Sequence, residues 1–140
     1  MKKHFLWMLL AMSAAAVADQ TPGDEISARS GLPASEVAAL LSNCDGSQTS
    51  MNFCAWRDQI VAERELQHVI DQQGSEHPDR KAALEARISK WKKARDASCE
   101  KSARKEWGDG SMRPAAQAIC VTSSTKTMTK RLVASSHKGA

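Results

Sequence analysis

Aromatic residues are scarce in this sequence: its 140 residues include four Trp, two Phe and no Tyr. With so few large side chains, a domain of this size buries a limited core and benefits from covalent cross-links. The sequence also lacks any sustained alternation of β-branched residues, so it predicts no β-sheet. Because the length suits one domain, we expect a single all-α domain, a small bundle of about three main helices plus a short N-terminal helix.

Long hydrophobic runs are also absent, apart from one short stretch at the start. Lys2 and Lys3 precede an apolar run over residues 5–10, and small residues lead to Ala18. This pattern predicts a secretory signal peptide over residues 1–18, cleaved near Ala18; an uncleaved N-terminal anchor is the alternative. The run is too short to cross a bilayer as a helix. The expected location is the periplasm or the cell exterior, with no membrane span.

A strong excess of charge is missing once the predicted signal peptide is removed. The remaining chain has 18 Lys and Arg against 16 Asp and Glu, a net charge of +2, so the pI near 9.0 overstates its basicity. Nucleic-acid binding requires a concentrated basic face. The balanced total gives that function little support, and we predict no nucleic-acid partner.

Cysteine occurs at only four positions, Cys44, Cys54, Cys99 and Cys120, all after the predicted signal peptide. An even number of cysteines in an exported chain predicts two disulfides. The spacings do not resemble those of zinc ligands, and no histidine lies near any of these cysteines. The sequence therefore predicts neither a metal site nor a cofactor.

Helical patterns cover most of the remaining sequence. Apolar residues recur at helical spacing in three long segments, and Gly74 follows the first of them as a stop signal. The predicted helices are a short one within residues 32–43 and long ones over about 50–73, 79–104 and 113–133.

The flanking segments carry weaker signals. Residues 19–31 are polar and contain Pro and Gly, so residues 19–43 are expected to form a flexible lead-in that contains only the short helix. Residues 134–140 are expected to be a frayed tail. The folded domain is therefore predicted to span residues 44–133.

The short connections between the long helices predict how the cysteines are arranged. Consecutive helices joined by short loops pack antiparallel, which brings all four cysteines to one end of the bundle. We favour the local pairs Cys44–Cys54 and Cys99–Cys120, while Cys44–Cys120 with Cys54–Cys99 remains open.

Several short stretches together resemble the LprI-type lysozyme-inhibitor domain of bacterial envelope proteins. They are CDGSQTSMNFCAW, Glu65-Leu66, WKKARDASC, GDGSM, and Cys120 followed by Thr125 and Leu132. The resemblance covers about residues 44–132. It implies a helical, disulfide-bonded periplasmic domain that inhibits lysozyme.

The sequence departs from that family pattern at a few positions. Gln67 and Ile70 stand where the family usually has Asn and Tyr, and Met128 stands where it usually has Arg. If that Arg pairs with a carboxylate in relatives, the pair is missing from this chain.

Five residues are predicted to have structural roles. Arg95 is expected to pair with a carboxylate on a neighbouring helix, and Asp96 to brace the turn that contains Ser111. The alternative is that this Arg-Asp pair belongs to a partner-binding surface. The apolar members of the set are Trp56, Leu66 and Trp91.

The segment KEWGDGSMRP is the predicted binding loop. Trp107 stands where the second long helix ends, and exposed Trp residues are frequent anchors of protein interfaces. Asp109, Ser111 and Arg113 would supply polar contacts around it. The alternative is that Trp107 folds back over Cys99 and Cys120 and covers the helix end.

No residue pattern supports catalysis. His68, His77 and His137 have no serine or cysteine nucleophile in a recognisable motif, and disulfide-bonded cysteines offer no thiolate. Gly108 and Gly110 match no phosphate-binding fingerprint. We therefore expect a non-catalytic protein-binding domain that inhibits lysozyme by occluding its active-site cleft. The alternative is a structural or immunity-type envelope protein with a different protein partner.

Overall fold

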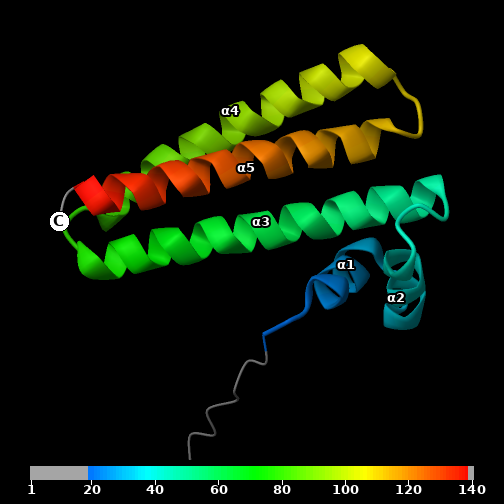
Figure 1. Ribbon diagram of the computed structural model, residues 1–140, viewed down its shortest axis with the longest axis horizontal. Coiled ribbons are helices and arrows are strands. Elements are labelled where there is room, and N and C mark those ends of the chain that lie inside the picture. Colours follow the sequence, from blue (N-terminus) through cyan, green and yellow to red (C-terminus); the bar gives the residue numbers. More distant parts are fainter. Residues whose placement is uncertain (1–18, 139–140) are drawn as a thin grey trace, which may run out of the picture.

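The computed structural model describes residues 19–138, and every regular element in that range is a helix (Figure 1). The predicted signal peptide lies outside the described residues. No helix in the described range is long and apolar enough to cross a membrane. The helices are α1 (Pro22–Ser30), α2 (Ala34–Ser42), α3 (Gln48–Glu76), α4 (Lys81–Trp107) and α5 (Arg113–Lys138).

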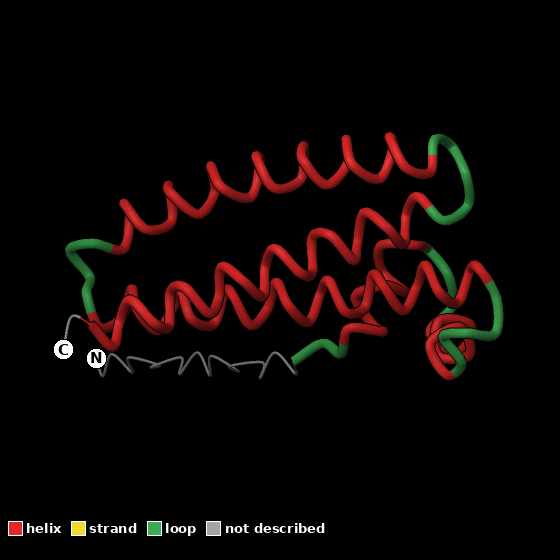
Figure 2. Tube along the Cα trace, turned by 45° about the horizontal axis from the view of Figure 1, so that its top comes forward, coloured by secondary structure: helices red, strands yellow, loops and turns green. Residues whose placement is uncertain are grey.

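The three long helices alternate in direction, as their short connections predicted. Figure 1 shows α5 lying between α3 and α4, and Figure 2 shows the two short loops that reverse the chain at opposite ends. α5 packs along both of its neighbours, whereas α3 and α4 contact each other much less. The C-terminal helix is therefore the central element of the bundle.

A small apolar core joins the three long helices in the half of the bundle that contains the turn between α3 and α4. Leu66, Ile70, Ile88 and Leu132 are buried together, and half-buried Trp91 packs against them. Burial of one such aliphatic side chain contributes about 1.5–3 kcal/mol. Leu66 and Trp91 thus both belong to this core.

The segment before α2 differs from the flexible lead-in that the sequence predicted, because residues 22–30 form helix α1. Thr21 caps this helix: its hydroxyl oxygen accepts a hydrogen bond from the Asp24 N–H at 3.1 Å, and the Asp24 carboxylate accepts one from the Thr21 N–H at 3.1 Å. Pro22 supplies the first helical position, and Gly31 ends the helix with a left-handed φ of 75°.

α1 and α2 pack against the first half of α3. Ile26, Val37 and Ile60 are buried together, with half-buried Phe53 and Trp56 against them. Arg64 of α3 also pairs with Glu25 of α1 at 2.6 Å. This apolar anchor explains why the N-terminal segment is ordered, and it gives Trp56 its structural role.

The long helices extend beyond several of their predicted ends. α3 begins after the N-cap residue Ser47 and continues past Gly74 to Glu76. Gly74 is buried within the helix, where a Cβ would lie 3.0 Å from Cγ of Lys81. The missing side chain of Gly74 therefore leaves room for the first turn of α4, and the glycine does not end α3. α5 likewise continues to Lys138, through most of the segment predicted to fray.

Two disulfides clamp one end of the molecule. Cys44 is bonded to Cys54 and Cys99 to Cys120, which confirms the locally paired connectivity. In the chain-entropy model each loop contributes about 3 kcal/mol. Both bridges lie toward the end where α3 and α5 begin and α4 ends, so this disulfide end is the covalently braced part of the bundle.

Charge is strongly segregated along the chain and therefore across the molecule. Residues 19–79 contain three Lys and Arg against 11 Asp and Glu, a net charge of −8. Residues 80–138 contain 15 Lys and Arg against five Asp and Glu, a net charge of +10. Because α1, α2 and α3 lie on one side of Figure 1 and α4 and α5 on the other, an acidic side opposes a basic side.

Candidate functional site

The turn between α4 and α5 lies at the disulfide end, and glycine determines its shape. Gly108 has a φ of 54°, in the left-handed region that glycine favours, and its N–H bonds to the Arg104 carbonyl at 2.9 Å. Gly110 donates to the Trp107 carbonyl at 2.9 Å, and a Cβ there would lie 2.9 Å from the same oxygen. Both glycines are therefore needed for so tight a reversal.

Polar contacts then fix the turn in place. Arg113 Nη1 donates to the Asp109 carboxylate at 2.6 Å and to the Gly108 carbonyl at 3.3 Å. Asn52 of α3 donates through Nδ2 to the Ser111 carbonyl at 3.2 Å. The predicted loop residues are thus held together in one turn, which is attached to a second helix.

Apolar packing between α3 and the start of α5 anchors the turn. Met112, the last residue before α5, packs with Met51 against a small cluster of buried alanines. The alanines are Ala55, Ala115 and Ala118. Small residues allow α3 and α5 to approach closely here, so the base of the turn is rigid.

Trp107 is the exposed aromatic residue of this turn. It retains 40 % of its surface exposed, whereas Asp109 has 94 % of its side chain exposed and Arg113 has 32 %. Trp107 is therefore partly covered by the protein and partly open to solvent. The predicted binding residues Trp107, Asp109, Ser111 and Arg113 lie along one turn, which we call the α4–α5 turn surface.

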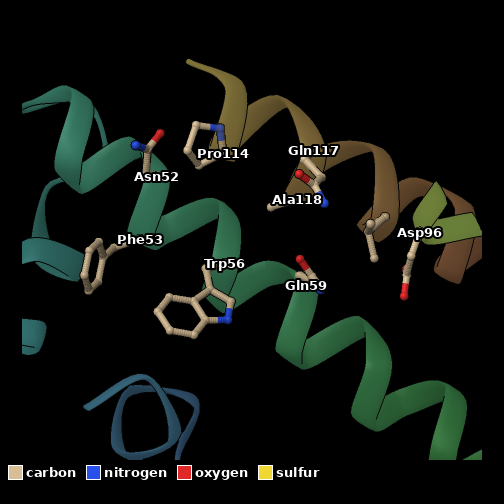
Figure 3. Close-up of a pocket in the computed structure, with 9 residues that line it drawn as sticks. Asn52, Phe53, Trp56, Gln59, Asp96, Pro114, Gln117 and Ala118 are labelled. Atoms are coloured by element: carbon tan, nitrogen blue, oxygen red, sulfur yellow. The ribbon is translucent and has the colours of Figure 1, made fainter. Parts of the chain in front are cut away.

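A groove of about 500 Å³ lies beside this turn surface, between α3 and α5. Figure 3 shows Asn52 and Pro114 near one another, with Trp56 and Gln59 farther along α3. Phe53 and Trp56 meet edge to face, with ring centroids 5.9 Å apart. Asn52 both lines the groove and holds the Ser111 carbonyl, so groove and turn form one continuous surface.

Arg95 is a buried brace among all three long helices. Its Nη2 lies 3.0 Å from Oε1 of Glu63 on α3, and its Nη1 donates to the Thr125 hydroxyl on α5 at 2.8 Å. Its guanidinium carbon lies 5.2 Å from the Trp91 ring centroid. Only 6 % of the residue is exposed, and Arg95 pairs there with a carboxylate on a neighbouring helix.

Asp96 differs from its prediction. Its carboxylate accepts a hydrogen bond from Arg95 Nε at 2.8 Å and lines the groove, and it does not brace the turn. The Ser111 carbonyl is held instead by Asn52, which lies 59 positions earlier in the chain. Sequence patterns gave no sign of this contact, because a single Asn on a helix has no distinguishing spacing.

The disulfide end combines a fixed turn with a groove. It presents one aromatic ring, a carboxylate, an arginine and a shallow groove on a covalently braced scaffold. All four cysteines are bonded in pairs.

A family model described as "Lysozyme inhibitor LprI" matches residues 42–132. The chain belongs to the LprI lysozyme inhibitor family. The matched region contains both disulfides, Arg95 and the α4–α5 turn surface, whereas α1 and nearly all of α2 precede it. No significant match occurs among curated proteins or among solved structures. Membership in an inhibitor family favours binding to a protein over catalysis.

Proposed function

We propose that this protein binds a lysozyme and inhibits it by covering the active-site cleft with its disulfide end. The observation that carries the proposal is the family match, which spans the whole disulfide-braced surface. The proposed location is the periplasm or the cell exterior, where disulfides persist and lysozymes act.

The α4–α5 turn surface is the proposed point of entry into the cleft. Its two glycines, the Arg113 contacts and the Asn52 anchor fix its shape before binding, which lowers the entropy cost of association. Both hydrogen bonds of Arg113 use Nη1, so Nη2 can meet a carboxylate of the partner. Glycosidase clefts hold a pair of catalytic carboxylates, and these are the proposed acceptors.

Charge segregation supports the choice of partner. Lysozymes are typically basic, and a slightly basic inhibitor as a whole would gain no long-range attraction. The acidic side formed by α1, α2 and α3 has a net charge of −8, however, and can attract and orient a basic protein. Association is therefore proposed to be electrostatically steered even though the total charge is slightly positive.

The test combines a functional assay with direct binding. Residues 19–140 are mixed with lysozymes of several classes, cell-wall lysis is followed by turbidity, and complex formation is measured by calorimetry. We expect lysis to slow at micromolar inhibitor. Unchanged lysis, with no heat of binding to any lysozyme, contradicts the proposal. In that case, recovery of a different periplasmic protein by pull-down would support the alternative partner.

A single substitution tests the contact surface. Trp107→Ala is expected to weaken lysozyme binding by about 2 kcal/mol, or about thirtyfold in Kd, because a central aromatic anchor is lost. The matched control is Val133→Ala, which removes a side chain of similar exposure, 39 % against 40 %, near the opposite end of α5. Equal Kd values for the two variants would exclude the turn surface as the contact site.

A further inference from the structure

The outward side of α4 is a continuous basic face. At 100° per residue, six of the nine Lys and Arg residues of α4 fall within a sector of about 120°, opposite the buried residues Ile88, Arg95 and Cys99. All six are exposed. We define the basic face of α4 as Arg87, Lys90, Lys93, Lys101, Arg104 and Lys105.

Acidic residues are kept off this face. The four carboxylates of α4 lie outside the sector, with Glu100 at its edge, and the spaces between the cations are occupied by alanines. Among the described residues only Arg104 of the six has an ion-pair partner, Glu100 at 3.0 Å. The face therefore presents positive charge that is almost uncompensated locally.

α4 is also the edge helix of the molecule. In Figure 1 it lies on the far side of α5 from α1, α2 and α3, and its tertiary contacts are with α5 and, to a lesser extent, α3. No described element covers the outward side. The surrounding half of the chain, residues 80–138, has a net charge of +10, so the face lies in a wide region of positive potential.

We propose that the basic face of α4 docks the protein on the surface of an anionic phospholipid bilayer. Between Arg87 and Lys105 the cations extend along roughly 27 Å of a helix at 1.5 Å per residue. Because Lys and Arg side chains are long and flexible, the charged ends of cations spread over a sector of about 120° can reach one plane. A flat array of lipid phosphates matches this straight row of cations in both shape and charge.

The composition of the face selects this partner over others. It has no large apolar side chain, so the helix would rest among the headgroups and would not insert into the acyl region. It has no aromatic ring on which nucleic-acid bases could stack. Docking through α4 would turn the acidic side away from the bilayer, toward soluble proteins.

The inference does not depend on lysozyme binding, and vesicle sedimentation tests it directly. Residues 19–140 are mixed with vesicles of phosphatidylcholine alone or with about one-third phosphatidylglycerol, at about 0.05 M NaCl. We expect binding only to the anionic vesicles, with loss of binding at about 0.5 M NaCl because the charges are then screened. Heparin and double-stranded DNA are tested in parallel, and binding to either without binding to vesicles overturns the proposal.

Alanine variants distinguish the face from overall charge. Each cation near an anionic surface contributes a similar part of the binding free energy. Replacing three of them is therefore expected to lower the vesicle partition coefficient by about a hundredfold. Alanine is also the best helix former, so the fold should persist, as circular dichroism would verify. The variant combines Lys90→Ala, Lys93→Ala and Lys101→Ala.

The matched control removes the same charge elsewhere in the basic half. It combines three substitutions at exposed positions of α5, namely Lys126→Ala, Lys130→Ala and Arg131→Ala. We expect the vesicle partition coefficient of this variant to fall by less than about tenfold, because the variant weakens only the general attraction between the basic half and the anionic vesicles. An equal loss in both variants would overturn the assignment to α4, as would the absence of binding to anionic vesicles.

Discussion

At the scale of single residues, one buried arginine connects the helices that form the bundle. Arg95 reaches Glu63 on α3 and Thr125 on α5 from its position on α4, and Thr125 is completely buried. The sequence allowed half of this arrangement to be predicted, since a cation at an inward helical position requires a carboxylate. It could not identify Glu63 as that partner, because α3 carries five carboxylates with similar spacing.

Replacing Arg95 with alanine is expected to lower the free energy of unfolding by about 2–3 kcal/mol. The change leaves Glu63 without its partner and removes a donor from buried Thr125. Urea denaturation followed by circular dichroism measures the loss.

An exposed arginine of the same helix supplies the control. Arg104 pairs with Glu100 at 3.0 Å, but both side chains are more than half exposed, so Arg104→Ala should cost less than about 0.5 kcal/mol. Equal unfolding midpoints for the two variants would contradict the bracing role of Arg95.

At the scale of helices, periodicity predicted the long elements well and the shortest one poorly. The three long segments repeat apolar residues over many turns, whereas α1 has nine residues and buries only Ile26. The signals that specify α1 are its caps: Thr21 with Asp24 at one end and Gly31 at the other. They are visible in the sequence, but turn residues such as Pro22 and Gly23 give the same segment the composition of a loop.

The cap of α1 has a specific dependence on pH. The Thr21 hydroxyl donates to Asp24 Oδ2 at 2.7 Å and the Thr21 N–H donates to the same oxygen, which holds the pKa of Asp24 below its ordinary value. Because the folded pKa is depressed, the cap stabilises the helix above the unfolded pKa of about 3.9 and loses its effect as the pH falls through the lower folded pKa.

A titration followed by carbon NMR should therefore place the Asp24 midpoint below that of an unstructured Asp. Thr21→Ala is expected to move the midpoint back upward, because both the hydroxyl donor and the cap geometry are lost. A midpoint for Asp24 that does not respond to Thr21→Ala would rule out the hydrogen bond as the cause.

At the scale of the whole molecule, two features escaped prediction for different reasons. The order of antiparallel helices does not specify which one lies in the middle, and the groove is lined by residues of three helices that are far apart in the sequence. Charge segregation, by contrast, was present in the sequence. Adding the charges to a total of +2 concealed it, because −8 and +10 nearly cancel.

Reduction of the disulfides is expected to unfold the protein at moderate temperature. The two bridges together contribute about 6 kcal/mol in the chain-entropy model, compared with a total stability of about 5–15 kcal/mol for a small domain. Thermal unfolding by circular dichroism with and without a thiol reductant measures the effect. An unchanged melting temperature, with full reduction verified by mass spectrometry, would refute it.

Charge segregation leads to a kinetic prediction for the proposed lysozyme complex. If the acidic side steers a basic partner, the association rate should fall about tenfold as NaCl rises from about 0.05 to 0.5 M, while the dissociation rate changes little. Stopped-flow fluorescence of Trp107 and its surroundings can follow both rates. An association rate that is insensitive to salt would argue against steering, although not against binding.

The central position of α5 has a consequence for the order in which the protein can fold. α3 and α4 contact each other much less than either of them contacts α5, and α5 follows both in the chain. A nascent chain that has reached Trp107 still lacks the surface on which its apolar stripes are buried. The three-helix bundle can therefore close only after α5 has been synthesised and has inserted between its two neighbours.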